Sequence, residues 1–210
     1  QLKDAILRNA ILKDADLHNA LMIKADLTEA NLEGANLHAE NLTKAVMVKA
    51  NLQNADLGNA IMTDVDLTNA NLRGADLSRA NLRMANLTGA DLEDENLTNA
   101  NLVNAKMIGA DLSRSDLRRA NLSGADLTDA KLVETKLTYA NLRGTNLEGA
   151  DLTGANFSAA VYDSSTKFPE GFDPNGGYEV DMMEKPKIMG DYKGKAKTAI
   201  QGKLNGLKCY

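Results

Sequence analysis

The sequence predicts an all-β solenoid in which the chain turns a corner every five residues. Thirty-two positions from Leu2 to Phe157 share one register without insertion or deletion, and twenty-seven of them are leucine. On an α-helix a step of five residues rotates by about 140°, so these leucines would circle every face. On a strand an odd step sends alternate leucines to opposite sides. A corner at every fifth residue brings all of them to one shared interior.

The other positions of the repeat fit this interpretation. Two places before the central residue, 25 of 31 residues are alanine, which is small enough for a crowded corner. Directly before the central residue, 23 of 32 are Asp or Asn. Asp, Asn, Gly, Ser and Thr suit tight bends because they tolerate turn conformations or bond to their own backbone. No proline precedes Pro169, as expected if backbone N–H groups pair between coils.

The motif Ala-(Asp/Asn)-Leu-Xaa-Xaa, as in Ala75-Asp76-Leu77, resembles the consensus of the pentapeptide-repeat family over about three quarters of the chain. This resemblance implies a right-handed, quadrilateral parallel β-helix with twenty residues per coil, and therefore about eight coils. Residues twenty apart would then be stacked neighbours. The segment Tyr162–Phe172 also resembles cyanobacterial and chloroplast-lumen members, through the pattern Tyr-Asp-Xaa-Xaa-Thr-Xaa-Phe-Pro-Xaa-Gly-Phe.

We expect two segments, a β-helix over residues 1–160 and a C-terminal cap with a basic tail over residues 161–210. The repeat ends before Val161, and aromatic residues and prolines follow it. Phe157 is expected to plug the last coil, with residues 168–172 folded across its open edges. A short helix is predicted in the tail from four residues with helical spacing: Ala196, Ile200, Leu204 and Leu207.

Composition excludes several classes of protein. The net charge of −5 is unevenly distributed, with −6 over residues 1–160, +6 over residues 185–210 and the remaining −5 between them. Cys209 is the only cysteine, so no internal disulfide is possible. No stretch reaches the ~20 apolar residues of a membrane helix. The sequence has no Gly-rich phosphate loop and no metal-protease helix motif. We therefore expect neither an enzyme nor a cofactor, while cytoplasm, periplasm and thylakoid lumen stay open as locations.

Six apolar residues flank central positions, where side chains are expected to face solvent. In twenty-residue coils they fall on two adjacent sides of the first four coils, and we call them the apolar patch: Ile6, Leu21, Ile23, Val46, Val48 and Ile61. Patches of this kind usually mark a contact. Three occupants remain open, namely an N-terminal cap, the protein's own tail, or another protein.

Glu40 and Glu95 replace alanine at inward positions, where a carboxylate requires a partner, a raised pKa or a bend outward. Ser115 and Thr135 replace alanine one and two coils after Glu95, which predicts an internal polar track of Glu95, Ser115 and Thr135. Five basic residues lie outside this region, either as an ordinary charged wall or as an anion or partner site: Arg114, Arg118, Arg119, Lys131 and Lys136.

His18 and His38 are the only histidines and fall in one outward column, one coil apart. Their spacing would let both imidazoles approach one metal ion, with Asp16 as a third ligand. Because no fourth ligand is evident, two surface histidines without a metal are the favoured interpretation.

Together these features predict a non-enzymatic scaffold that binds another protein and does not bind nucleic acid. The alternative is a DNA mimic that binds DNA gyrase or another topoisomerase, an activity that the resemblance implies for some members with acidic rods. The weak charge of −6, the dilution of Asp by Asn and the Arg/Lys wall argue against it. Oligomeric state and partner identity do not follow from the sequence.

Overall fold

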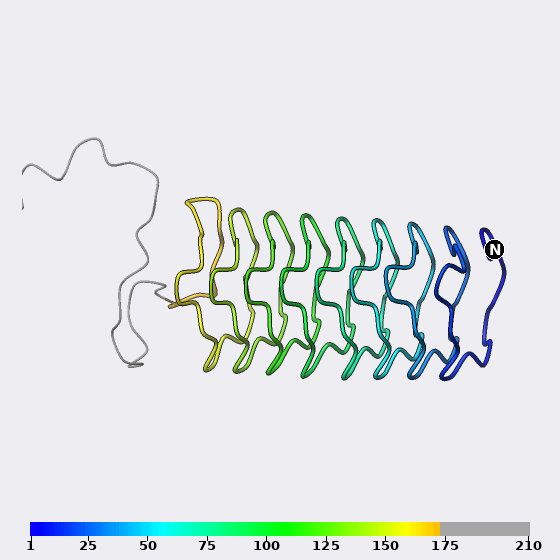
Figure 1. The fold of residues 1–210 in the computed structure, drawn as a ribbon. Helices are drawn as coiled ribbons and strands as arrows, with labels where there is room; N and C mark the ends of the chain where they lie inside the picture. Colours follow the sequence, from blue (N-terminus) through cyan, green and yellow to red (C-terminus); the bar gives the residue numbers. More distant parts are fainter. Residues whose placement is uncertain (173–210) are drawn as a thin grey trace, which may run out of the picture.

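The computed structural model describes residues 1–172. In this part of the chain the backbone winds into coils stacked along one axis, with the N-terminus at one end (Figure 1). Parallel bridges pair residues twenty apart, from Ile6 with Asp26 to Asn141 with Val161. Four repeats therefore complete one coil. Residues 1–172 contain no helix and no strand longer than a single bridge residue, because the chain turns after each pairing.

The repeats form four walls, numbered by their first central residues: wall 1 from Leu2, wall 2 from Leu7, wall 3 from Leu12 and wall 4 from Leu17. Coils 1 to 8 cover residues 1–160 in steps of twenty. Within each repeat we name a wall residue, the central residue, two turn residues and an inner residue. The run from Asp26 to Ala30 gives these five positions in order.

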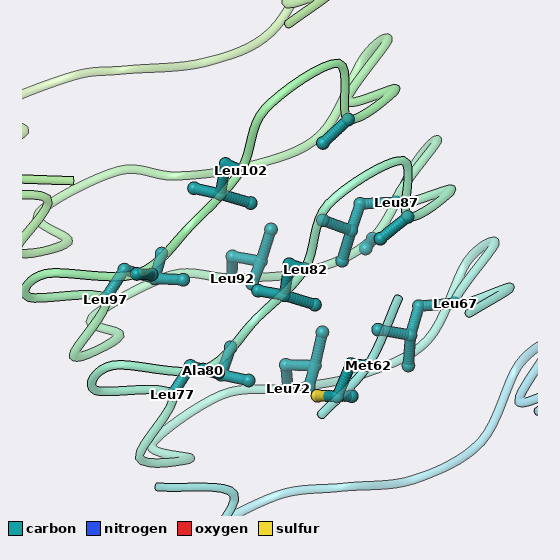
Figure 2. Packing of buried hydrophobic residues seen from close by; sticks show 14 of the residues in the cluster. Met62, Leu67, Leu72, Leu77, Ala80, Leu82, Leu87, Leu92, Leu97 and Leu102 are labelled. Atoms are coloured by element: carbon teal, nitrogen blue, oxygen red, sulfur yellow. The ribbon is translucent and has the colours of Figure 1, made fainter. Parts of the chain in front are cut away.

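Central and inner residues fill the interior of the rod. From Met22 to Leu147 every central residue is at most 1% exposed. Central residues from all four walls meet inside each coil, as Leu82, Leu87, Leu92 and Leu97 do in coil 5 (Figure 2). Burying each leucine contributes about 1.5–3 kcal/mol, so this column is the main favourable contribution to folding.

Every repeat turns its corner in the same backbone conformation. The inner residue donates its N–H to the preceding central carbonyl, as Ala75 N does to Leu72 O at 2.9 Å. The second turn residue has a positive φ in all thirty-two turns, which is the mark of a type II turn. Gly, Asn and Asp fill many of these positions, as the sequence predicts. Bulkier residues, including Met84 and Tyr139, fill others at the cost of backbone strain.

Three further backbone N–H groups of each repeat join neighbouring coils. The central residue donates to a wall residue of the next coil, as Leu67 N does to Asn86 O at 2.7 Å. The wall residue donates back to an inner carbonyl, as Asn86 N does to Val65 O at 2.8 Å. The second turn residue donates to a first turn residue of the next coil, as Asn69 N does to Thr88 O at 2.9 Å. The turns are therefore stacked as firmly as the walls.

The fifth N–H, that of the first turn residue, is bonded by a side chain. Thr28 N donates to Asp26 Oδ1 at 3.1 Å, and the Thr28 hydroxyl donates to the same oxygen at 2.6 Å. The hydroxyl bond lowers the pKa of the Asp26 carboxyl, against the effect of burial. This Asx turn recurs on all four walls, for example at Asn41, Asp76 and Asp126. It explains why Asp or Asn precedes the central leucine.

An aromatic cluster closes the C-terminal end of the last coil. The ring centroids of Phe157 and Phe172 are 5.7 Å apart, and those of Tyr162 and Phe168 are 5.4 Å apart. Phe168 and Phe172 thus lie over Phe157, where the sequence predicts a cap. The predicted tail helix and Cys209 lie outside the described residues. The division into segments 1–160 and 161–210 therefore remains a prediction.

The Asx turns predict graded losses of stability along one rod. Asp66 Oδ1 accepts three hydrogen bonds, from Thr68 N, the Thr68 hydroxyl and Asn86 Nδ2. Asn71 Oδ1 accepts one, from Arg73 N. Because each such bond contributes about 0.5–1.5 kcal/mol, Asp66→Ala should lower the free energy of unfolding about two to three times as much as Asn71→Ala. Urea denaturation followed by circular dichroism measures both, and equal losses would contradict the assignment.

Candidate functional sites

Glu95 is the most unusual polar residue of the interior. Its side chain enters the column of inner residues of wall 3 and is 2% exposed. Its Oε1 accepts a hydrogen bond from Ala75 N at 3.2 Å, while Oε2 is buried without a hydrogen-bond partner. Burial raises the pKa of the Glu95 carboxyl to about 9, although the Ala75 and Gly74 amides oppose the shift. The group is therefore neutral at physiological pH.

The glutamate also interrupts the regular backbone ladder. In the described coils 4 to 6, three periodic bonds are missing at this corner: Glu95 N to Leu92 O, Asn96 N to Ala75 O and Gly74 N to Glu93 O. The Ser115 hydroxyl replaces the first of them. It accepts from Glu95 N at 3.2 Å and donates to Leu92 O at 2.5 Å. The Ser115 hydroxyl thus stands in for the backbone bond inside this turn, while the Glu95 carboxyl accepts from the Ala75 and Gly74 amides of the preceding coil.

The side chains of the predicted internal polar track are not hydrogen-bonded to one another. Thr135 donates to Leu112 O at 2.8 Å and does not reach Ser115 or Glu95. Thr145 occupies the same inner position on wall 1 and donates to Leu122 O at 2.9 Å. Each hydroxyl bonds a turn carbonyl of the preceding coil because that acceptor is nearer than the next side chain. The track is therefore a set of separate side-chain-to-backbone bonds.

Glu40 makes a second, smaller disturbance in the same kind of position. It is buried, and its Oε1 accepts from Met22 N at 3.2 Å. Close by, Leu21 has a φ of +57° although it is a wall residue, a conformation that bulky residues rarely adopt. The regular bridge between Leu21 and Asn41 is missing from the described pairings. The buried carboxyl and the strained leucine therefore mark one local defect in coils 2 and 3.

The five basic residues do not form one continuous cationic surface. Arg114 pairs with Glu93 and, at 2.8 Å, with Asp94, while Lys131 pairs with Asp111 at 3.1 Å. These residues lie on wall 3, where carboxylates compensate them. The other three lie on wall 4: Arg118, Arg119 and Lys136. Arg118 pairs with Asp116 at 2.6 Å, and the Arg119 guanidinium lies 5.8 Å from the centre of the Tyr139 ring.

The two histidines lie on wall 4, and each imidazole contacts an oxygen atom of the next coil. The two rings are therefore not directed at a common metal position. His18 Nδ1 lies 3.2 Å from the His38 carbonyl oxygen, and His38 Nδ1 lies 3.1 Å from Asp56 Oδ1. Asp16 Oδ1 accepts from Asn36 Nδ2 at 3.0 Å. In residues 1–172 no group of three or more His, Cys, Asp or Glu side chains has an arrangement that could hold a metal ion.

The apolar patch lies on walls 1 and 2 of coils 1 to 4. Ile6 and Ile61 are 80% and 43% exposed, and the other four members are half-buried. Asp26 separates Ile6 from Val46 on wall 2, and Asn41 precedes Ile61 on wall 1. The patch is therefore two interrupted apolar columns on adjacent walls.

Sequence reasoning missed four exposed large apolar or aromatic residues in coils 1 to 8, namely Ile11, Met84, Ile108 and Tyr139, of which Ile11 and Tyr139 are the most exposed. Ile11 is a wall residue like Ile6 and is 84% exposed at the open N-terminal coil. The sequence could have revealed Ile11, because most repeats have Asp or Asn at this wall position. Tyr139 is 61% exposed in a second turn position. Its signal is a bulky residue where the turn requires a positive φ.

Comparison with protein families gives a clear result. A family model for pentapeptide repeats matches the chain in eight copies, over residues 1–38, 25–64, 63–94, 96–132 and 130–160. No curated protein matches the sequence.

Solved structures of similar proteins include several from cyanobacteria and one from a plant. HetL of Nostoc, a pentapeptide repeat protein involved in regulating heterocyst differentiation, is 31% identical over 78% of this chain and 87% of its own, with a TM-score of 0.38. A second Nostoc pentapeptide repeat protein is 43% identical over 47% of this chain and 77% of its own, with a TM-score of 0.29. One from the Arabidopsis thaliana thylakoid lumen is 32% identical over 50% and 66%, with a TM-score of 0.24.

In residues 1–172 no helix is long and apolar enough to cross a membrane.

Glu95 predicts a pH-dependent contribution to stability. Its pKa is about 9 in the folded chain and near its ordinary value of 4.5 when unfolded. Between these values the unfolded state releases the proton while the folded state keeps it, so a rise in pH favours unfolding. Glu95→Gln removes the titration, and the variant should gain more stability over the native chain at pH 8 than at pH 5.

Urea denaturation of both proteins at the two pH values measures this difference. The other carboxyl groups are common to both chains, so their effects on the free energy of unfolding cancel in the comparison. A gain of the same size at pH 5 and pH 8 would show that Glu95 is ionised in the folded state.

Proposed function

Because this chain belongs to the pentapeptide-repeat family, whose members are generally structural or interaction proteins, we propose that it is a non-enzymatic scaffold that binds another protein. We also infer for its four-sided coil the right-handed β-helical path of the family. Rigidity supports this role, because each coil is bonded to the next through walls and turns alike. A rod of this kind holds surface residues at fixed positions along four walls.

The observation that carries the proposal is the apolar patch on walls 1 and 2. Wall residues elsewhere are mostly Asp or Asn, which bond the turn amide. Leu21, Val46 and Ile61 lack an oxygen for this bond, so they weaken the local turn without entering the core. An apolar residue at such a position gains burial only when another molecule covers it. We therefore propose that the patch is the principal partner-binding surface.

The DNA-mimic alternative finds less support on the surface. Wall 3 holds a cluster of carboxylates, and Arg73 contacts Glu93 and lies 3.7 Å from Asp91. Arg114 and Lys131 neutralise the same cluster from the next coils. A rod that imitates a duplex requires an unbroken negative field. A DNA gyrase supercoiling assay without any effect of the protein would remove this alternative.

The apolar patch can be tested with substitutions that the fold should tolerate. Val46→Asn and Ile61→Asn introduce the residue type that the repeat favours at these positions. The double variant should keep its melting temperature while binding a partner at least tenfold more weakly, since it loses central apolar contacts. Affinity capture identifies partners of the native chain, and titration calorimetry with each purified partner measures the change.

Met84→Asn is the matched control, because Met84 is also exposed but lies outside the patch, in a turn of coil 5. Partners that bind the native chain and the double variant equally would rule out the patch as their binding surface.

A further inference from the structure

Arg118, Arg119, Lys136 and Tyr139 lie together on wall 4 of coils 6 and 7, and we call them the Arg119–Tyr139 patch. All four side chains are exposed. Arg119 and Tyr139 occupy the same second turn position in consecutive coils, and Arg119 N bonds to Thr138 O at 3.1 Å. The guanidinium lies over the ring at 5.8 Å. The ladder therefore fixes the backbone spacing from which the Arg119 and Tyr139 side chains extend.

The fold itself does not require Tyr139. Its φ is +62°, a conformation that costs a bulky residue about 1–2 kcal/mol. Its side chain is 61% exposed, so little burial offsets this cost. The same corner of wall 4 holds Asn59 in coil 3 and Asn99 in coil 5, which suit the turn better. An exposed tyrosine beside an arginine is instead the composition of a binding hot spot.

The patch is positive on a rod that is otherwise acidic. Wall 4 places one carboxylate, that of Asp116, beside the three cations of the patch. Asp116 forms an ion pair with Arg118, and its backbone forms a β-bridge with that of Lys136. Glu134 lies at the corner shared with wall 3 and is the other carboxylate that borders the patch. The flanking wall residues Asn96 and Asn156 are uncharged. Asp116 is therefore shared between the charges of Arg118 and Lys136, and within residues 1–172 Arg119 has no carboxylate partner on this wall.

We propose that the Arg119–Tyr139 patch is a second docking surface, which binds an acidic segment of a partner protein. Carboxylates of that segment would pair with Arg119 and Lys136, and an apolar or peptide group would pack on the Tyr139 ring. Residues 185–210 of the protein's own tail have the wrong charge, because they carry seven lysines and one aspartate. Residues 173–184 carry four carboxylates and no lysine or arginine, so occupation of the patch by this segment is an alternative outcome, which would abolish saturable binding of an added acidic peptide. A nucleic acid would meet one exposed ring and few cations on an acidic rod, which gives it little to bind.

This surface is distinct from the apolar patch. It lies on wall 4 of coils 6 and 7, whereas the apolar patch lies on walls 1 and 2 of coils 1 to 4. The inference takes from the proposed function only that the partner is a protein. The substitutions that test the two surfaces do not overlap, so either surface can fail alone.

The test uses the full chain and a poly-L-glutamate peptide as the probe. Arg119→Asn and Tyr139→Asn introduce the residue that coils 3 and 5 already have at this corner, so the turn should be preserved. Fluorescence anisotropy of a labelled peptide should show saturable binding that added NaCl weakens. Each substitution should weaken binding about tenfold, and Lys136→Asn somewhat less. Thermal melting confirms that each variant is folded.

Arg79→Asn is the matched control, because Arg79 is exposed in the same corner position of coil 4 and is not paired with an aromatic ring. It should leave peptide binding unchanged. An equal loss with Arg79→Asn would mean that the rod attracts the peptide without a site. Unchanged binding by Arg119→Asn and Tyr139→Asn would place the peptide elsewhere, for example on the lysine-rich tail. Absence of saturable binding, or tighter binding of a duplex DNA that the same substitutions weaken, would also overturn the proposal.

Discussion

The structure depends on how five backbone N–H groups per repeat are bonded. Four of them have backbone acceptors: one inside the turn and three in the neighbouring coils. The fifth belongs to the first turn residue and takes the side-chain oxygen of Asp or Asn two residues earlier, as at Asn31 and Glu33. A buried or half-buried amide without an acceptor is costly. The consensus Asp or Asn is therefore a backbone requirement, and the negative charge of the aspartates is secondary to it.

This requirement separates the parts of the chain that are fixed by folding from those that are free. Central and inner positions are fixed by volume, as the fully buried Leu72 and Ala80 illustrate. Wall positions are fixed by the Asx bond, and second turn positions by a positive φ. The first turn position has the weakest constraint, and it holds residues as different as His18, Arg73 and Val103. A residue that departs from the pattern at a strongly restricted position is therefore more informative about function than one at the first turn position.

The sequence predicted the repeat, the buried leucine column and the twenty-residue stacking, because all three follow from the period and the family resemblance. It also predicted where Glu40 and Glu95 would lie. It did not predict that Ser115 bonds the backbone beside Glu95, since the direction of a hydroxyl depends on local acceptor distances. The compensation of Arg114 by Glu93 and Asp94 was missed as well. Ion pairs between coils depend on rotamers that sequence spacing alone does not determine.

Glu95 and Tyr139 illustrate two kinds of violation with different consequences. Glu95 breaks the volume rule inside the rod, and the interior responds with displaced backbone bonds, a supporting serine and a raised pKa. Its effect is therefore on stability. Tyr139 breaks the turn rule on the outside, where no neighbouring group buries the ring and the Arg119 guanidinium covers it only in part. The rod itself offsets the cost of Glu95, whereas the exposed ring of Tyr139 is buried when a molecule binds over it. For this reason the surface departures, and not the buried ones, are where we place binding.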